Sequence, residues 1–487
     1  MPVRSRPPVT LRLRLLLLVA LALAGSALLA PAASAAQART GCTQTGAQGT
    51  SSDWTCFWGP VDVAGYEVRQ EVTGGIPKPP VDGAVTRMDV DVTNVNGQPM
   101  SIKRLMLHHI VFLNLGERFG DKQDATCDRI TMFDARTTVP AQMERFYAAG
   151  EERATLDLPP GYGYRLKPSE TWGTVWMFMN HRAAADRAFI RYRVTVDSAP
   201  DLVHTTPYWL DAANCSADPV WSVPGGGRPG SVHTRTTTFT MPQSGRIVAA
   251  GGHVHGGAKD LAVSQPSCGD RRLWTHKPAW APRDHPFYTV KPILHEPGPL
   301  AMSAMQSQQG IPVAAGEQLK LSANYDNSRL HTRVMGISVL HLAPDAGVTE
   351  RCGALPADLS EPQTTQPHRT ALPTFTVPLT GLDARGRARE IDRPPGPTRR
   401  VPSGTTIRVG DNFFSRPNLE VRAGSTLRWA FAGRQLHNVT VASGPRGFSS
   451  DNLDRGRVYT RRLTARGTYK LFCALHPVAM AETVRVR

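Results

Sequence analysis

Four residues near the C-terminus have the types and spacing of a metal site. Cys473, His476 and Met480 share one predicted loop, and the pair His437-Asn438 lies upstream of it. One thiolate, two imidazoles and one thioether form the ligand set of a blue-copper electron-transfer site, where a weak axial Met lets copper change between Cu(I) and Cu(II). A buried structural Cys beside an unrelated Met is the alternative, but it explains neither the spacing nor the upstream pair. We therefore expect these residues to bind copper and carry electrons.

Two further histidine arrangements lie in the first two thirds of the chain. Adjacent residues on a regular strand point to opposite faces, so His108 and His109 could bind one metal only at a bulge or a strand end. In His253-Val254-His255 both imidazoles lie on one face of a strand, within reach of one ion. Each arrangement alone also fits ordinary packing, whereas together they predict a second region of metal chemistry.

In combination and order, these motifs resemble the copper type II, ascorbate-dependent monooxygenases, the family of peptidylglycine α-hydroxylating and dopamine β-monooxygenases. The resemblance covers roughly residues 89–344. It implies one copper held by His108, His109 and a later histidine, for which His181 has the matching position at a strand end. It implies a second copper held by the His-X-His motif and a distant methionine, matched by Met335. The competing positions are His204, His233 and His331 for the histidine, and Met302 and Met305 for the methionine.

The chain departs from this family at its substrate anchors. The peptide-amidating members have an Arg two positions before the His-X-His motif, where this chain has Gly251. Their Asn and Tyr after the Met correspond to Ile337 and Val339 here. Peptide amidation is therefore not expected, and no residue identifies a catecholamine substrate.

The C-terminal segment resembles the cupredoxins, in particular plastocyanin-like domains. His437, Cys473 and His476 align with the family's ligands, and short alternating strands surround them. The spacing between His476 and the axial Met480 is intermediate between those of plastocyanins and amicyanins.

Together the resemblances imply an exported copper-dependent monooxygenase that hydroxylates a C–H bond with O₂ and carries its own electron-transfer domain. His253, His255 and Met335 would form the catalytic site, and the His108 site would store an electron. Up to three coppers are expected, with an external reductant such as ascorbate or a redox protein. The alternatives are a non-catalytic periplasmic or extracellular copper-binding electron-transfer protein, and a binding scaffold beside a working cupredoxin. The substrate, a small molecule or a peptide-like compound, is not identified by the sequence.

Strand-rich segments must position these residues. Alternating apolar runs dominate and long amphipathic helical patterns are scarce, which predicts an all-β protein. We expect two tandem jelly-roll-type β-sandwiches followed by a cupredoxin β-sandwich. The predicted segments are a signal peptide (1–36), two copper-binding sandwiches (37–205 and 206–355), a Pro-rich linker (356–400) and the cupredoxin domain (401–487).

The N-terminal segment predicts export. Arginines precede a Leu/Ala-rich run that is too short for a membrane span, and Ala33-Ser34-Ala35 offers a cleavage site. We expect a secreted or cell-envelope protein without a membrane span. Besides Cys473, six cysteines remain, which in this compartment predicts three disulfides. Cys42 and Cys56 form a plausible local pair, and the other pairings stay open.

The positive charge is concentrated at the C-terminus. The formal net charge is +16, and residues 401–487 contain 14 Lys and Arg against 5 Asp and Glu. A basic electron-transfer domain favours an acidic electron-donor partner or an anionic envelope polymer, and simple solubility is the alternative. Nucleic acid is not an expected partner, because basic and aromatic residues are not interleaved.

Overall fold

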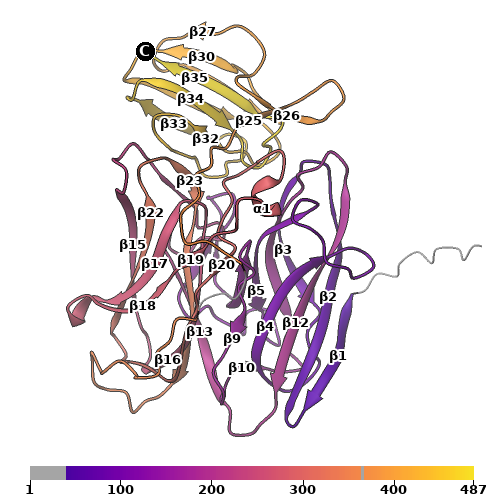
Figure 1. Ribbon diagram of the computed structural model, residues 1–487, viewed down its shortest axis with the longest axis vertical. Helices are drawn as coiled ribbons and strands as arrows, with labels where there is room; N and C mark the ends of the chain where they lie inside the picture. The colour runs from indigo at the N-terminus through magenta and orange to yellow at the C-terminus, as the bar shows by residue number, and fades with distance from the viewer. Residues whose placement is uncertain (1–39, 363–366) are drawn as a thin grey trace, which may run out of the picture. The chain divides into compact units, whose positions relative to one another are not determined.

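The computed structural model describes residues 40–362 and 367–487 (Figure 1). The predicted signal peptide lies outside these residues. The prediction of an all-β protein is confirmed: in the described ranges the helices are α1 (Pro286–Thr289) and the 3-10 turn η1 (Pro266–Cys268). Within the same ranges, no helix has the length and apolar character needed to cross a membrane.

The first sandwich packs a four-stranded sheet against part of a ten-stranded sheet. Its core is rich in aromatic side chains, with Trp172, Trp176 and Phe112 almost fully buried between the sheets. The four-stranded sheet has the order β3 (Val68–Ile76), β11 (Trp172–Met179), β5 (Met106–Asn114) and β8 (Glu144–Gly150). The facing strands of the larger sheet are β1 (Gly41–Gln48), β2 (Ser51–Val63), β12 (Asp186–Asp197), β4 (Gly83–Thr93) and β10 (Tyr162–Leu166), with β9 (Leu156–Asp157) beside β4.

The ten-stranded sheet continues into the second sandwich. The connection is a parallel pairing of β10 with β13 (Val203–Asp211), which then pairs with β24 (Gly336–Pro344). The continuing strands are β13 (Val203–Asp211), β24 (Gly336–Pro344), β16 (Gly245–Val254) and β21 (Met305–Val313). They share a core with a second four-stranded sheet, formed by β15 (Val232–Thr240), β22 (Gln318–Asp326), β17 (Ala258–Gln265) and β18 (Arg271–His276).

Short strand pairs complete this part of the chain. They are β6 (Arg129–Thr131) with β7 (Thr138–Pro140), β14 (Trp221–Val223) with β23 (His331–Val334), and β19 (Pro278–Ala279) with β20 (Ala301–Met302). The predicted linker contains a hairpin of β25 (Leu379–Leu382) and β26 (Ala388–Ile391). The hairpin contacts the first sandwich, where Tyr66 Oη accepts a hydrogen bond from the Ala388 backbone at 2.8 Å.

The C-terminal sandwich has its own core around Trp429 and Tyr469. In β31 (Ser425–Phe431) every second residue is buried, because one face of the sheet packs inward. One sheet contains β27 (Arg399–Arg400), β30 (Asn418–Val421), β35 (Ala481–Val486), β34 (Gly467–Phe472) and β32 (Thr440–Ser443). The other contains β29 (Phe413–Phe414), β28 (Thr406–Gly410), β31 (Ser425–Phe431) and β33 (Val458–Leu463).

Three disulfides form, as the cysteine count predicts. Cys42 pairs with Cys56 across the hairpin of β1 and β2, as the sequence suggests. The two pairings that the sequence left open are Cys127–Cys215 and Cys268–Cys352. Cys473 is free and buried, so its sulfur remains available as a ligand.

Candidate metal centres

The cupredoxin residues meet at one end of the C-terminal sandwich. Cys473 directly follows β34, and its Sγ lies 3.6 Å from His476 Nδ1 and 3.9 Å from His437 Nδ1. The two imidazole ring centroids are 4.7 Å apart. Met480 is fully buried in the same core, and its carbonyl accepts a hydrogen bond from the Cys473 backbone. One sulfur and two ring nitrogens therefore converge on one point.

Hydrogen bonds fix the orientation of these ligands. His437 Nε2 lies 3.0 Å from Asp411 Oδ1, which leaves Nδ1 facing the sulfur. The His437 contact and two backbone N–H groups hold the pKa of Asp411 below its usual range. Asn438 donates its backbone N–H to Cys473 Sγ at 3.4 Å, and its side-chain oxygen accepts the Ala474 N–H at 2.8 Å. Supporting hydrogen bonds of this kind set ligand geometry and tune a thiolate–copper centre.

The C-terminal segment is similar in sequence to an amicyanin. Over 89 residues it is 30% identical to amicyanin-alpha of Methylorubrum extorquens, covering 17% of this chain and 74% of amicyanin-alpha. Through its C-terminal domain, the chain belongs to the amicyanins. This similarity agrees with the cupredoxin fold that the ligand spacing of the C-terminal segment predicts.

Solved structures match the same share of the chain. A reduced amicyanin variant is 24% identical and covers 17% of this chain and 81% of its own, with a TM-score of 0.16. A purple cupredoxin from Nitrosopumilus maritimus is 25% identical and covers 18% of this chain and 98% of its own, with a TM-score of 0.15. No protein-family model matches the chain.

A second group of imidazoles lies where the two larger sandwiches meet. We call these residues the histidine cluster. His108 is central to it, with ring centroids 4.9 Å from His295, 5.1 Å from His255 and 5.3 Å from His109. The members are His108, His109, His181, His253, His255, His295 and His331.

A β-bulge accounts for the paired histidines. In the pairing of β5 with β11, His109 lies opposite Met177 and Leu107 opposite Phe178, so His108 is the extra residue. A bulge breaks the alternation of side chains along a strand. The rings of His108 and His109 can therefore lie near each other, although the residues are adjacent. From the sequence, we expected this pair to bind one metal only at a bulge or at a strand end, and the structure has the bulge.

The structure groups the predicted ligands differently from the family resemblance. The resemblance assigns His108 and His255 to different coppers, whereas their rings are neighbours here. His181 follows β11, and its ring lies 6.2 Å from that of His295. Met335, next to β24, is buried and lines one cavity together with His109 and His253.

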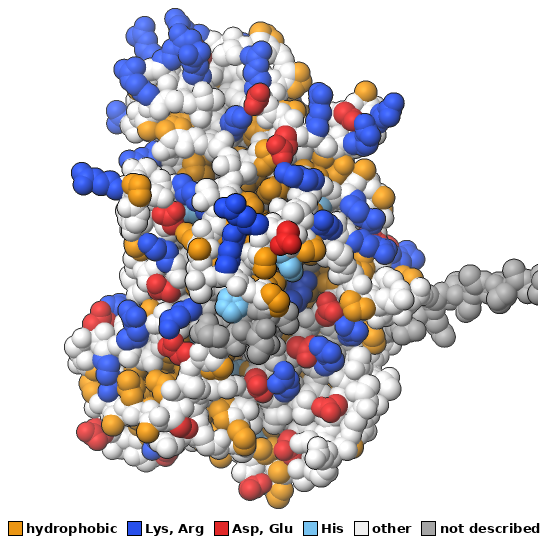
Figure 2. Space-filling model, in the orientation of Figure 1, with side chains coloured by type: hydrophobic (Ala, Val, Ile, Leu, Met, Phe, Trp, Pro, Cys, Tyr) orange, Lys and Arg blue, Asp and Glu red, His pale blue; other side chains and the backbone are white. Residues whose placement is uncertain are grey.

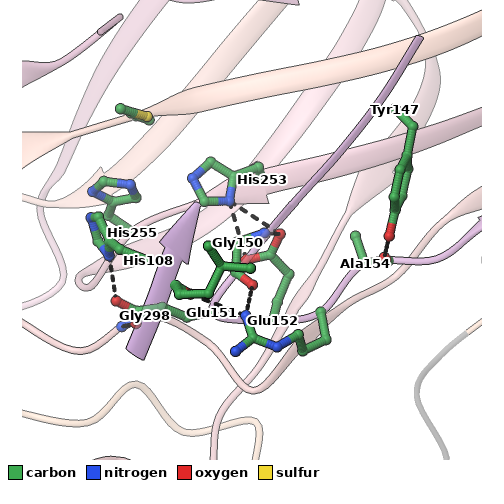
Figure 3. Close-up of polar contacts among 12 residues, drawn as sticks. His108, Tyr147, Gly150, Glu151, Glu152, Ala154, His253, His255 and Gly298 are labelled. Atoms are coloured by element: carbon green, nitrogen blue, oxygen red, sulfur yellow. Dashed lines mark hydrogen bonds and ion pairs between the residues drawn. The ribbon is translucent and has the colours of Figure 1, made fainter. Parts of the chain in front are cut away.

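Most cluster imidazoles have one ring nitrogen held by an oxygen. His108 Nδ1 donates to Glu151 Oε1 at 2.6 Å, and His253 Nδ1 lies 3.1 Å from both oxygens of Glu152 (Figure 3). His255 Nδ1 donates to the Arg333 carbonyl at 2.8 Å. Three further rings make hydrogen bonds of the same kind. His181 Nδ1 donates to the Pro292 carbonyl, His331 Nδ1 to Glu296, and His295 Nε2 to Glu151.

The opposite ring nitrogens are buried and have no hydrogen-bond partner. This holds for Nε2 of His181, His253, His255 and His331, and for Nδ1 of His295. A neutral imidazole that donates through one nitrogen presents a bare lone pair on the other, as metal-binding histidines do. Unpaired buried polar atoms are costly, so their concentration in one place fits a site built for metal ions.

Burial and buried carboxylates set the charge of this region. Burial lowers the pKa of His255 and of His109 well below the usual value, which keeps both rings neutral. Burial acts to raise the pKa of Glu151, but His295 and His108 outweigh it and hold that pKa well below its usual range. An ionised glutamate beside the proposed ligands offsets the charge of a bound cation.

Several members of this region were not predicted from the sequence. His295, Glu151, Glu152 and Glu296 were not predicted, and His331 was named only as a competitor of His181. The adjacent acidic pair after β8, and the pair His295-Glu296, are the signals that could have indicated them. The other competing residues lie elsewhere. His204 is exposed on β13, and the His233 ring lies 5.7 Å from the Trp221 ring in a tilted arrangement. Met302 lies on β20, and Met305 belongs to the second core.

Hydrogen bonds connect the cupredoxin site to the histidine cluster. The Asn438 side chain donates to Asn452 at 2.9 Å, and Asn452 donates to Asp218 at 3.2 Å. Asp218 pairs with the guanidinium of Arg333, whose carbonyl accepts the hydrogen bond from His255. A cavity of about 80 Å³ also separates the two regions, lined by cluster histidines and by Phe472 and Ala474 beside Cys473.

Proposed function

We propose that the chain is a copper-dependent monooxygenase whose cupredoxin domain delivers electrons to the histidine cluster. The observation that carries this proposal is the set of unpartnered, buried imidazole nitrogens beside a hydrogen-bonded route to Cys473. Copper bound there would supply one-electron chemistry with O₂, to which neutral imidazole and thioether ligands are suited.

The protein residues would have defined tasks. His253, His255 and Met335 would hold the copper next to the substrate, and His108, His109 and His181 the copper that stores an electron. His295 and His331 are two further candidate copper ligands, because each has a buried ring nitrogen without a hydrogen-bond partner. Glu151, Glu152 and Glu296 would orient the rings by accepting their N–H groups.

The reaction balances with an external reductant. A substrate C–H bond, O₂, two electrons and two protons give an alcohol and water. The electrons would come from ascorbate or a redox protein and pass through Cys473. The three disulfides fit an extracellular or periplasmic location, where we propose that the protein works. Lys and Arg side chains gather on the cupredoxin domain (Figure 2), which favours an acidic electron donor.

A non-catalytic copper-binding electron-transfer protein is the second candidate. The short distance between the rings of His108 and His255 favours it, because the proposed sites for two coppers touch each other. Such a protein would exchange electrons, and its oxygen uptake would not increase when a substrate is added.

Oxygen uptake distinguishes the two functions. The copper-loaded chain would be supplied with ascorbate and a panel of neutral hydrocarbons, and the monooxygenase proposal expects uptake with formation of alcohol. Met335→Ile should abolish the substrate-dependent uptake, whereas Met302→Ile, at the competing position on β20, should leave it unchanged. Equal uptake by wild type and Met335→Ile would overturn the assignment of Met335, and no uptake with any substrate would favour the electron-transfer protein.

A further inference from the structure

A large apolar cavity opens between the first two sandwiches and reaches the histidine cluster. Its volume is about 610 Å³, within the range of small-molecule binding sites. Its lining includes two exposed side chains, Phe119 (74% exposed) and Val72 (48%), and two buried ones, His109 (7%) and Met335 (3%). The cavity therefore extends from the protein surface to candidate copper ligands, and we call it the apolar cavity.

Both sandwiches contribute apolar walls. Val111 from β5, Val175 from β11 and Ala148 from β8 line it from the first sandwich. Trp209 from β13 and Ile337 from β24 line it from the second. An apolar molecule that fills this space would be stabilised in proportion to the apolar surface that it removes from water.

The described residues that line the cavity offer no free charge. Arg145 is the only Lys, Arg, Asp or Glu among them. Its guanidinium is buried and makes two hydrogen bonds to Asp124, at 2.6 and 2.9 Å, while stacking 4.7 Å from the Trp209 ring centroid. A substrate carboxylate or ammonium would therefore lose its hydration without gaining a partner, which disfavours its binding.

We propose that the apolar cavity binds a neutral, largely hydrocarbon small molecule, with one end beside His109 and His253. The two rings line the cavity and have unpartnered buried nitrogens, Nδ1 and Nε2 respectively. This inference deepens the proposed function by naming its substrate class. The oxidation of the molecule rests on the proposed function, whereas its binding does not.

Two fluorescent probes that differ only in a charged group test the proposal. N-phenyl-1-naphthylamine is neutral, and 1-anilinonaphthalene-8-sulfonate is the same molecule with a sulfonate. Both are titrated into the full chain, once with Cu(I) bound and once after copper removal. We expect the neutral probe to bind in both states, and the sulfonate to bind at least about tenfold more weakly to the same site.

Cavity-filling variants locate the binding. Ala148→Phe and Ala217→Phe add a ring to two different parts of the lining and should each weaken the neutral probe by about tenfold or more. Val232→Phe places the same ring at an exposed position of β15 outside the cavity and should change nothing. Circular dichroism on each variant identifies any that fails to fold.

The outcomes separate the two proposals. Probe binding that the cavity variants weaken, without oxygen uptake, supports the cavity and overturns the monooxygenase. The cavity proposal is wrong if the neutral probe does not bind, if Val232→Phe weakens it as much as Ala148→Phe and Ala217→Phe do, or if the sulfonate binds the same site equally well.

Discussion

Replacing Glu151 by Gln should weaken copper binding by the histidine cluster. The buried carboxylate accepts hydrogen bonds from His108 Nδ1 at 2.6 Å, from His295 Nε2, and from the Gly298 backbone at 2.8 Å. A glutamine has the same size but offers one acceptor oxygen and an NH₂ group, which opposes the N–H of an imidazole. At least one ring would turn or change its tautomer.

The magnitude follows from the role of such supporting groups. Loss of a carboxylate that orients a histidine ligand costs about 10- to 100-fold in metal affinity, which corresponds to about 1.4–2.8 kcal/mol. The loss of negative charge acts in the same direction, because Glu151 is ionised and buried beside the proposed ligands.

Competition for Cu(I) measures this change. The full chain, carrying Cys473→Ser to remove the cupredoxin copper, is titrated anaerobically with Cu(I) against bicinchoninate. Glu317→Gln is the matched control, because Glu317 is also buried and accepts hydrogen bonds from Gln265 and Ala314, but it holds no histidine. Unchanged affinity in Glu151→Gln, or an equal loss in Glu317→Gln, would refute the role of Glu151.

Three further perturbations test the structure elsewhere. Asn438→Ala removes the hydrogen bonds to Ala474 and Asn452, so we expect a loss of about 1–3 kcal/mol in unfolding free energy and a shifted visible copper band; an unchanged band contradicts its positioning role. Burial lowers the pKa of His341 from 6.5 to about 4. Between these pH values the unfolded chain binds more protons than the folded chain, so the free energy of unfolding decreases as the pH falls from 6.5 to 4. His341→Gln should reduce the loss of unfolding free energy between pH 6.5 and pH 4 by up to about 3 kcal/mol, as measured by denaturant titrations at each pH. An unfolding free energy that depends on pH equally in the variant and the wild type contradicts this. Replacing both cysteines of the Cys127–Cys215 disulfide by Ala, which frees a loop with a separation of 88 residues, should cost about 4 kcal/mol in urea unfolding, and no loss would show that the bond does not stabilise the fold.

Local patterns in the sequence predicted the fold class and the cupredoxin site. The alternating strands and the loop of Cys473, His476 and Met480 depend on short-range spacing, which a sequence displays directly. The sequence also indicated a bulge or a strand end at His108 and His109, because adjacent histidines can share a metal only where the alternation of side chains is interrupted. The structure has a bulge there. The similarity to amicyanin-alpha confirms the prediction of a cupredoxin-like domain.

Long-range packing explains what the sequence could not predict. Glu151 follows β8 of the first sandwich, whereas its partner His295 lies in a loop of the second, so only the docking of the sandwiches brings them together. The same docking places the rings of His108 and His255 beside each other and forms the apolar cavity. Two disulfide pairings also required the three-dimensional structure, because six cysteines permit many connectivities.

Copper counting tests whether the histidine cluster binds copper in addition to the cupredoxin domain. Metal analysis and visible spectroscopy would be applied to the full wild-type chain and to Cys473→Ser after copper loading and removal of excess metal. We predict three coppers and one intense thiolate-to-copper band for the wild type, and two coppers without the band for the variant. One copper in the wild type and none in Cys473→Ser would contradict it.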